Sequence, residues 1–298
     1  MWEKPSLEGK ANQNLLRTTD MSLNLNIIGK EMDPISFRYN KDTLILYALG
    51  IGAGVGELDF VYEKNLMVFP TFAVIPFLPA FAPFALEAGL NMPAVLHGEQ
   101  KIILHGPIPT SGTVLTTARC PSIYDKGDKG AIINLEINTR NEKGELLFEN
   151  QAVIVDRSEG NFGGDRGPKS DVFDPPQDIS PDFHVEDTTS PNQAALYRLS
   201  GDKNPLHIDP EFAQKAGFDR PILHGLCSYG FAGRALLNSL CKRDPSRLKS
   251  FAVRFVNAAF PGDTLITEGW RLKEGMYIIQ TKNQDGEVIL GNGLAEIA

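Results

Sequence analysis

The chain has 298 residues, enough for two domains of ordinary size, and 42% hydrophobic and 22% charged residues, as in an ordinary water-soluble protein. The formal net charge is −8 and no basic cluster stands out, so we expect no nucleic-acid partner, because phosphate binding needs concentrated Lys and Arg. Three cysteines, Cys120, Cys227 and Cys241, lack Cys-x-x-Cys spacing, which argues against a disulfide framework or a zinc site and indicates a reducing compartment.

The first part of the chain predicts a tail, a helix and a turn. Residues 1 to 25 show no clear period and lack an apolar signal core, so we expect a loosely held tail and no secretion. The apolar run 44–49 favours a helix, and the glycine-rich stretch 50–56 follows it. A dinucleotide-binding loop would need a strand before the glycines and a helix after them, so the stretch is interpreted as a turn.

The most apolar segment runs from Met67 to Leu90. Four prolines interrupt it: Pro70, Pro76, Pro79 and Pro83. No run of eighteen apolar residues occurs in the chain. We therefore expect a buried or pocket-lining segment and no membrane partner.

A strand-rich block follows, and then a linker. β-Branched or alternating runs predict strands over 101–104, 113–118, 130–139 and 146–156, with turn signals between them. Residues 157–185 are rich in Gly, Pro, Asp and Ser and are the predicted linker. It would join a first unit, 26–156, to a second unit, 186–298.

Three landmarks recur in the same order in both halves and predict an internal duplication. They are a His-Gly pair (97–98 and 224–225), a Pro/Gly turn before a strand (111–113 and 261–264), and a late hairpin (141–145 and 283–287). We expect two α+β units, each with a long helix laid on an antiparallel sheet. The stripe expected to be buried on the second helix contains Leu226, Phe231, Leu236, Leu237 and Leu240, with Gly230 and Gly233 allowing close approach.

The stretch from Tyr197 to Gly225 carries the candidate chemistry. Asp202, Asn204 and His207 lie within six residues, on a segment that prolines keep from becoming helical. Asp202 and His207 form a candidate acid–base pair, and Asn204 can orient a water molecule or the substrate. The alternative is an ordinary turn, in which the Asp and Asn side chains bond their own backbone. Asp209 is expected to cap a short helix that begins at Pro210.

Gly225 is expected to open the long second helix. A backbone N–H at that position is unpaired and suits a developing oxyanion, although a plain helix-start glycine is the alternative. His224 beside it is interpreted as a structural histidine. No metal site is predicted, because the spacing of the polar residues fails the calcium-loop and two-histidine zinc patterns. A Gly-x-Ser-x-Gly hydrolase elbow is not found in the sequence.

These residues closely resemble the signature of the (R)-specific enoyl-CoA hydratase type 2, or MaoC-like dehydratase, family. The matching segments are Tyr197-Arg-Leu-Ser-Gly-Asp-Lys-Asn-Pro-Leu-His207 and Pro221-Ile-Leu-His-Gly225, with Tyr47-Ala-Leu-Gly, Pro70-Thr-Phe and His97-Gly-Glu-Gln in the first half. The resemblance covers residues 30 to 298 and is to the two-domain version found in the peroxisomal multifunctional enzymes of type 2.

The resemblance implies a fold and a set of site residues. The fold is an α+β double hot dog, in which a curved antiparallel sheet wraps a long helix in each half. Asp202 and His207 would be the catalytic pair, supported by Asn204, and the Gly225 N–H would hold the thioester carbonyl. The apolar segment 68–90 of the first half would accommodate a bulky acyl chain. Substrate contacts would map onto His97, Gly98, Lys126, Lys203, Pro205, Leu206 and Phe255. Arg254 is a further candidate for a CoA phosphate, from its charge and position alone.

The implied reaction is the reversible syn addition of water to a trans-2-enoyl-CoA, giving the (3R)-3-hydroxyacyl-CoA in fatty acid β-oxidation. It needs no metal or redox cofactor, and its partner is the acyl-CoA substrate; a homodimer is expected. The family expectation is a peroxisomal location, although the final residues are not a Ser-Lys-Leu type address. A thioesterase and a non-catalytic acyl-CoA binding protein on the same scaffold are the rival hypotheses.

Overall fold

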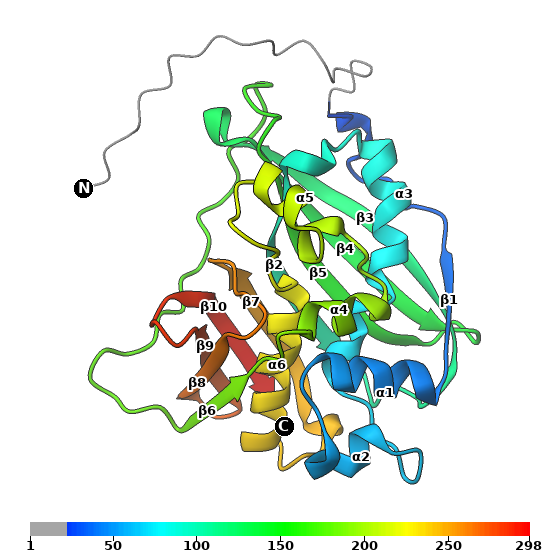
Figure 1. Ribbon diagram of the computed structural model, residues 1–298. Helices are drawn as coiled ribbons and strands as arrows, with labels where there is room; N and C mark the ends of the chain where they lie inside the picture. The colour runs from blue at the N-terminus through cyan, green and yellow to red at the C-terminus, as the bar shows by residue number, and fades with distance from the viewer. Residues whose placement is uncertain (1–22) are drawn as a thin grey trace.

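A single ten-stranded antiparallel sheet forms the frame of the protein (Figure 1). The structure, a computed structural model, describes residues 23–298. The strand order is β1-β3-β4-β5-β2-β7-β10-β9-β8-β6. Strands of the first half are β1 (Ile35–Tyr39), β2 (Val95–Leu104), β3 (Gly112–Asp125), β4 (Ala131–Asn141) and β5 (Leu146–Asp156). Those of the second half are β6 (Phe183–Thr188), β7 (Leu248–Phe255), β8 (Thr264–Lys273), β9 (Met276–Lys282) and β10 (Val288–Ile297).

The strand order reads the same from both ends once the halves are numbered alike. β1 corresponds to β6, β3 to β8, β4 to β9, β5 to β10 and β2 to β7. The two halves of the sheet meet where β2 pairs antiparallel with β7, from Glu99 opposite Arg254 to Ile103 opposite Ser250. This is the double hot-dog arrangement that the family resemblance implies, and the predicted fold class is confirmed.

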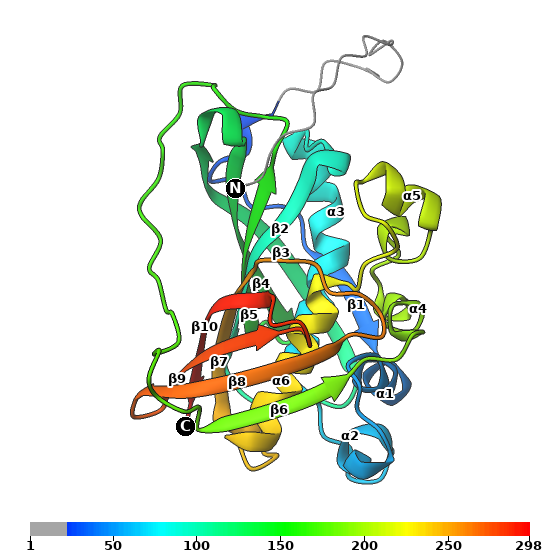
Figure 2. The same cartoon turned by 60° about the vertical axis from the view of Figure 1, so that its left-hand side comes forward.

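One long helix covers the sheet in each half (Figures 1 and 2). In the first half a 3-10 turn, Pro70–Val74, leads into α3 (Phe77–Ala88), and in the second half α6 spans Gly225–Ser239. The shorter helices are α1 (Lys41–Gly50), α2 (Leu58–Val61), α4 (Gln193–Tyr197) and α5 (Pro210–Lys215). The remaining 3-10 turns are η1 (Leu25–Ile27), η2 (Val55–Glu57), η4 (Met92–Ala94), η5 (Gly127–Lys129), η6 (Arg198–Ser200), η7 (Pro205–His207) and η8 (Pro245–Arg247).

Helix α6 packs tightly because of its two glycines. A methyl group at Gly230 would run into Ile51, and one at Gly233 would run into Thr71, both from the first half. Most of the stripe expected from the sequence is buried, with Leu240 only half-buried. The apolar faces of α6 and of the 70–75 segment therefore share one core across the two halves.

Several sequence-based expectations need revision. The predicted tail 1–25 falls largely outside the described residues, but its last part is packed, since Leu23 is buried. The His-Gly landmark does not mark equivalent positions, because His97 lies within β2 after its helix whereas His224 precedes its helix. The turn and hairpin landmarks do fall at equivalent places, before β3 and β8 and between β4–β5 and β9–β10.

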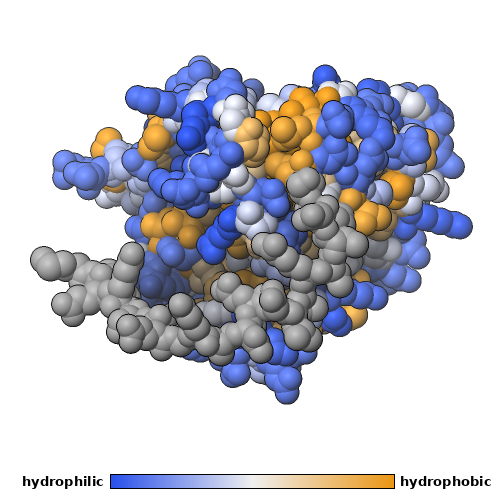
Figure 3. Space-filling model, turned by 90° about the horizontal axis from the view of Figure 1, so that it is seen from above, coloured by the Kyte–Doolittle hydropathy of each residue, from blue (hydrophilic) through white to orange (hydrophobic). Residues whose placement is uncertain are grey.

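The apolar segment 67–90 forms the core helix of the first half. By length and composition the helical stretch Pro70–Ala88 could cross a membrane, but 61% of its most apolar window is buried inside the protein. The buried share is what the core helix of a globular protein shows. Seen from above, the molecular surface is mainly hydrophilic, with apolar side chains gathered in a patch between polar ones (Figure 3).

Candidate active site

The candidate catalytic residues lie on an irregular loop between α4 and α5. Gly201 has a φ of 137°, a conformation that glycine adopts easily and other residues rarely do. After it, Asp202 Oδ1 accepts a hydrogen bond from the Asn204 N–H at 3.1 Å, and Asn204 Oδ1 accepts one from the Leu206 N–H at 3.1 Å. The turn chemistry that the sequence left as an alternative is therefore present. It uses one oxygen of each side chain and leaves Asp202 Oδ2 and the Asn204 amide group for other partners.

The loop brings a carboxylate and an imidazole face to face. Asp202 Oδ2 lies 3.9 Å from His207 Nε2, and the His207 side chain is only 9% exposed. On the other side of the ring, Nδ1 lies 3.0 Å from the Ile222 carbonyl oxygen. A carbonyl can only accept, so Nδ1 carries the proton, and in the neutral ring Nε2 presents its lone pair toward Asp202. A gap of this size allows one water molecule to donate to both groups.

Burial keeps His207 neutral. Desolvation lowers the pKa of His207 below its usual value, and the opposing effects of Asp202 and of the bond to Ile222 do not cancel it. A neutral imidazole with a free Nε2 is able to accept a proton near neutral pH.

His224 contacts and supports the loop that carries Asp202 and His207. Its ring lies 3.8 Å from the His207 ring, at an interplanar angle of 29°, and Nε2 donates to the main-chain carbonyl of Asp202 at 3.1 Å. Burial and the neighbouring His207 lower the pKa of His224 to about 3, so its ring is neutral. The structural role expected for His224 is seen at Nε2, although the buried Nδ1 has no partner among the described residues.

Asp202, His207 and His224 together offer three potential metal ligands within 4.8 Å of one another. The stacking of the two rings opposes this use. The lone pairs of imidazole lie in the ring plane, so two rings stacked face to face do not aim them at one point between the rings. The arrangement suits proton transfer better than ion binding.

Gly225 is the first residue of α6, as the sequence predicts. Its neighbours Cys227 and Ser228 donate to the His224 carbonyl, whereas the Gly225 N–H has no acceptor among residues 23–298. The helix dipole adds positive character at this end of a 15-residue helix. The ring of Phe255 lies close by, since a methyl group at Gly225 would sit 3.1 Å from two of its ring atoms. The N–H is therefore free to bind an oxyanion beside an aromatic wall.

His97 continues this wall from the first half. Its ring centroid lies 4.9 Å from that of Phe255, and its Nε2 is buried without a partner among the described residues. Burial lowers the pKa of His97 to about 4, against smaller opposing effects, first from the Glu99 backbone and then from the Asp202 charge. The next residue, Gly98, lies at a bulge in the β2–β5 pairing, and a side chain there would press on Val153 and Val155. Packing therefore already explains Gly98.

The other predicted substrate contacts are spread over two places. Lys203 and Pro205 are exposed, and Leu206 is half-buried, on the catalytic loop itself. Lys126 lies in the turn between β3 and β4, and in the strand order β3 is three strands away from β2. Arg254 gives two N–H groups to Glu99, at 2.8 Å and 2.6 Å, so its charge is already paired within the protein.

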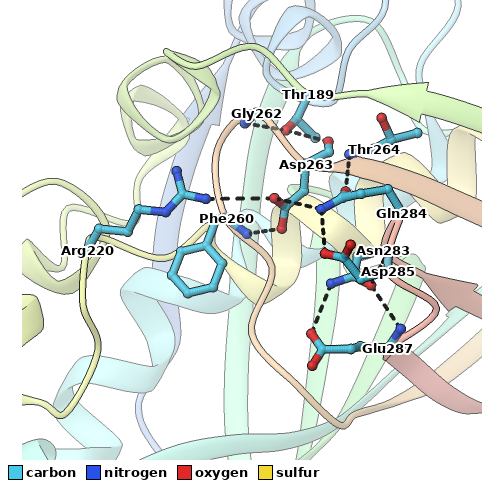
Figure 4. Close-up of polar contacts among 10 residues, drawn as sticks. All are labelled: Thr189, Arg220, Phe260, Gly262, Asp263, Thr264, Asn283, Gln284, Asp285 and Glu287. Carbon is cyan, nitrogen blue, oxygen red and sulfur yellow. Dashed lines mark hydrogen bonds and ion pairs between the residues drawn. The ribbon is translucent and has the colours of Figure 1, made fainter.

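A polar network fixes the loop that carries Ile222 (Figure 4). Arg220 lies over the Phe260 ring at 4.6 Å and 3.8 Å from Asp263 Oδ1, and the buried Asp263 accepts from the Phe260 N–H at 2.8 Å. Leu223 N–H donates to the Ala259 carbonyl at 2.7 Å. These contacts hold in place the carbonyl that fixes the tautomer of His207.

Two surface pockets formed by residues 23–298 bear on where a ligand could bind. One, of about 300 Å³, reaches His207 and is lined by Pro191, Asn192, Ala194, Ala195, Ile208, Arg220, Pro221 and Pro261. The larger, of about 690 Å³, lies at the start of β3 around Arg38, Tyr39 and Gly112, and does not include the acid–base pair.

Sequence reasoning missed the supporting contacts. Three contacts depend on how separate segments meet: those of the Ile222 carbonyl, of the Asp202 carbonyl, and of the Tyr197 ring, whose centroid is 5.0 Å from that of the His224 ring at an interplanar angle of 53°. Their signal in the sequence is only that the segments 197–207 and 221–225 are both rich in polar and conformationally special residues.

Two family models match this chain. One, described as a MaoC like domain, matches residues 173–292, and the other, an MFE-2 hydratase 2 N-terminal domain, matches residues 37–158. Each match covers one of the two halves of the sheet.

Relatives match over nearly the whole chain. A probable enoyl-CoA hydratase 2 of Dictyostelium discoideum is 39% identical, covering 91% of this chain and 95% of its own. A peroxisomal enoyl-CoA hydratase 2 of Arabidopsis thaliana is 38% identical, over 95% and 98% of the two chains. The crystal structure of a MaoC-like dehydratase from Phytophthora capsici aligns with a TM-score of 0.83 at 33% identity, over 93% and 98%.

Proposed function

Because the chain belongs to the MaoC-like dehydratase family, in its hydratase 2 branch, we propose that it is an (R)-specific 2-enoyl-CoA hydratase of fatty acid β-oxidation. It adds water reversibly to a trans-2-enoyl-CoA to give the (3R)-3-hydroxyacyl-CoA. The observation that supports the chemistry most directly is the 3.9 Å gap between Asp202 Oδ2 and His207 Nε2, close to a helix start with a free N–H.

In the proposed mechanism the Gly225 N–H binds the thioester oxygen. Withdrawal of electrons into this carbonyl makes C3 electrophilic and lets C2 carry negative charge as an enolate. The donor is fixed by the helix before the substrate arrives, so it stabilises the developing oxyanion without reorganising. One such donor is worth roughly 3 to 4 kcal/mol of barrier.

Asp202 and His207 activate the water. A water molecule in the gap donates one hydrogen to Oδ2 and one to Nε2, which directs an oxygen lone pair toward C3. As the C3–O bond forms, one of the two groups takes a proton from the water, and this proton is returned to C2 of the enolate. The electron pair of the C2–C3 double bond becomes the new C2–H bond, so atoms and charge balance.

The expected stereochemistry follows from the use of one acid–base pair, Asp202 and His207, for both proton transfers. Hydroxyl and proton both come from one side of the alkene, because water and both acid–base groups lie on the same loop. Syn addition is the outcome. Asn204, whose amide nitrogen is not used in the turn, orients the water or the substrate.

The decisive test is an enoyl-CoA assay with three readouts. We expect the enoyl absorbance to fall without release of free thiol, and the product to be oxidised by a (3R)-specific dehydrogenase. Release of thiol would instead identify a thioesterase, and a product used only by a (3S)-specific dehydrogenase would contradict the family's stereochemistry. The thioesterase hypothesis is not favoured, since relatives that match over nearly the whole chain are named enoyl-CoA hydratase 2 or 3-hydroxyacyl-thioester dehydratase.

The substrate contacts, cofactor requirement and assembly are also proposals. We propose that His97, Gly98 and Phe255 line the CoA arm, with Lys203, Pro205 and Leu206 at the entrance, and that the acyl chain lies along the 68–90 segment. No cofactor enters these steps, so activity should survive exhaustive dialysis against a chelator. A homodimer and a peroxisomal location are proposed from the family and from the Arabidopsis relative's name. Mass measurement in solution and microscopy of tagged protein test them.

A further inference from the structure

The segment that follows β5 is fastened to the turn between β3 and β4. The buried Asp125 carboxylate accepts three backbone N–H groups: from Gly127 at 2.7 Å, Asn161 at 2.9 Å and Gly163 at 2.8 Å. The bonds to these amides, the one from Gly127 first, lower the pKa of Asp125 below its usual value. In both ribbon views, residues 158–167 lie beside this turn (Figures 1 and 2). The first part of the predicted linker is thus pinned in place.

Glycines make this contact close. Gly127 has a φ of 65°, a backbone conformation that residues with a side chain rarely adopt, and it lies close to Arg166 Nη1. Gly167, with a φ of 72°, lies against the Tyr124 ring, where a methyl group would be 2.6 Å from ring carbons. Gly160 approaches the Gly127 carbonyl in the same way. These glycines cost conformational entropy on folding, and they let the backbone of the segment pack directly against the turn.

These contacts place two cationic side chains, those of Lys126 and Arg166, next to each other. Lys126 Nζ donates to the main-chain carbonyl of Arg166 and lies 5.6 Å from the centre of the Tyr124 ring. Arg166 Nη1 donates to the main-chain carbonyl of Asp125 at 3.2 Å, and its side chain is 67% exposed. Most of the N–H groups of both side chains remain available to a ligand.

The nearby acids are bound elsewhere. Asp125 uses its oxygens on backbone amides, with Arg166 Nη1 no nearer than 3.9 Å. Asp165 Oδ1 accepts from the Gly167 N–H at 2.8 Å, and Asp128 Oδ1 accepts from the Asn161 side chain at 2.9 Å. They shape the turn and do not form close ion pairs with the two cations.

Lys126 and Arg166 lie at the same end of the strands as His97. Val95 of β2 is opposite Asp156 of β5, which is opposite Ala131 of β4, which is opposite Asp125 of β3. Three strand spacings separate Val95 from Asp125, a distance of about 14 Å across the strand ends. The long pantetheine arm of CoA, with its thioester at Gly225 and Phe255, can cross the ends of β5 and β4 to bring a phosphate to this point.

On the premise of the proposed function, we propose that Arg166 joins Lys126 in binding a phosphate group of CoA. Arg166 forms the guanidinium half of the site and Lys126 the ammonium half, and the Asp125 contacts hold both in register. A guanidinium presents a fork of donors that matches phosphate oxygens. The linker thereby becomes part of the substrate site.

The test compares one enoyl group on three carriers: CoA, 3′-dephospho-CoA and pantetheine. With the full chain, Arg166→Ala is expected to raise KM for the CoA thioester about tenfold, leaving kcat unchanged. The same variant should behave like wild type on the pantetheine thioester, which has no phosphate. An effect that persists with the dephospho carrier assigns the diphosphate, and one that disappears assigns the 3′-phosphate; either supports the proposal.

Controls separate charge from structure. Arg166→Lys should recover part of the lost affinity, and Lys143→Ala, which removes a cation from the exposed turn between β4 and β5, should change nothing. An Arg166→Ala effect of equal size on the pantetheine thioester, or none on CoA, would overturn the proposal. If the wild type does not hydrate enoyl-CoA, the proposed function fails, whereas calorimetry of free CoA against pantetheine still tests Arg166.

Discussion

The two halves share one sheet plan, but the connection between the edge strand and the long helix differs between them. In the first half it follows β1 and in the second it follows β6. Tyr47 and Tyr197 mark equivalent points, since they lie in α1 and α4 with ring centres 6.2 Å apart. Five residues after Tyr197 comes Asp202, and five residues after Tyr47 comes Gly52.

The first half has no room for a carboxylate at that point. Gly52 has a φ of 83°, and a side chain there would run into the Phe231 ring of α6. Ten residues after the tyrosines, His207 corresponds to Glu57, which accepts from Arg234 at 2.7 Å and from Asn238 at 2.8 Å. The equivalent positions that carry chemistry in one half serve packing and ion pairing in the other. A scaffold can therefore keep its geometry while one of its two loops is given over to stability.

The largest effect is expected from the acid–base pair. Asp202→Asn and His207→Ala should each lower kcat for hydration by about 10² to 10⁴-fold, because each removes a group that handles the proton. Circular dichroism and thermal melts should show an intact fold. Glu57→Gln is the matched change in the first half, and it should leave kcat of the folded protein unchanged. Equal losses of kcat from Glu57→Gln and Asp202→Asn would break the comparison.

Arg234→Ala tests the ion-paired counterpart. Arg234 bridges the buried Glu57 and the half-buried Asp187, at 2.7 Å and 2.8 Å, so its removal leaves both carboxylates without their cation. We expect the free energy of unfolding to fall by about 3 kcal/mol, measured by urea denaturation. Normalised kcat should stay near that of wild type, and a loss of kcat without loss of stability would contradict this assignment.

Two glycines offer a third contrast. Gly52→Ala should destabilise the fold by about 1 to 3 kcal/mol, because of its positive φ and the nearby Phe231 ring. Gly225→Ala keeps the N–H, and its methyl group meets only the edge of Phe255 at 3.1 Å. It should barely change the melting temperature, yet lower kcat/KM about tenfold by crowding the thioester. The reverse pattern would exchange the roles of the two positions.

The last contrast concerns the pH dependence of stability, to which buried histidines in both halves contribute. The pKa of His97 is lowered to about 4 and that of His224 to about 3, in each case chiefly by burial. Between those values and the ordinary value of about 6.5, the unfolded chain binds more protons than the folded one. Stability should therefore be complete above pH 6.5 and fall on acidification, by up to about 1.4 kcal/mol per pH unit for each histidine.

Denaturation in urea at pH 7 and pH 5 measures this slope. His97→Gln and His224→Gln should each flatten it, and a slope unchanged by both substitutions would rule out these histidines as its source.

Local patterns in the sequence were enough to predict four strands of the first half, the long second helix and the polar loop, although 101–104 and 113–118 cover only parts of β2 (Val95–Leu104) and β3 (Gly112–Asp125). The strand 146–156 and the helix start at Gly225 match the structure, because alternation and capping are local signals. Local patterns could not predict which distant segments come into contact. The bonds from His207 to Ile222 and from His224 to the Asp202 carbonyl join residues far apart along the chain.

The linker shows the same limit. Its content of Gly, Pro and Asp is typical of an unattached segment, but Gly163 and Asn161 donate to a carboxylate that lies more than thirty residues earlier. The His-Gly repeat shows the opposite error, because two identical dipeptides fall in a strand and at a helix start. Composition describes a segment alone, whereas a tertiary contact depends on two segments.

The pairing of β2 with β7 joins both units within one polypeptide. Two identical copies assembled around such a seam would have to accept every substitution twice, once on each side. A covalently joined pair is free of that constraint, so a mutation harmful in one unit can become fixed in the other. Because the two units are parts of one polypeptide and pair through β2 and β7, one gene can encode two differently specialised units that are always made in a one-to-one ratio.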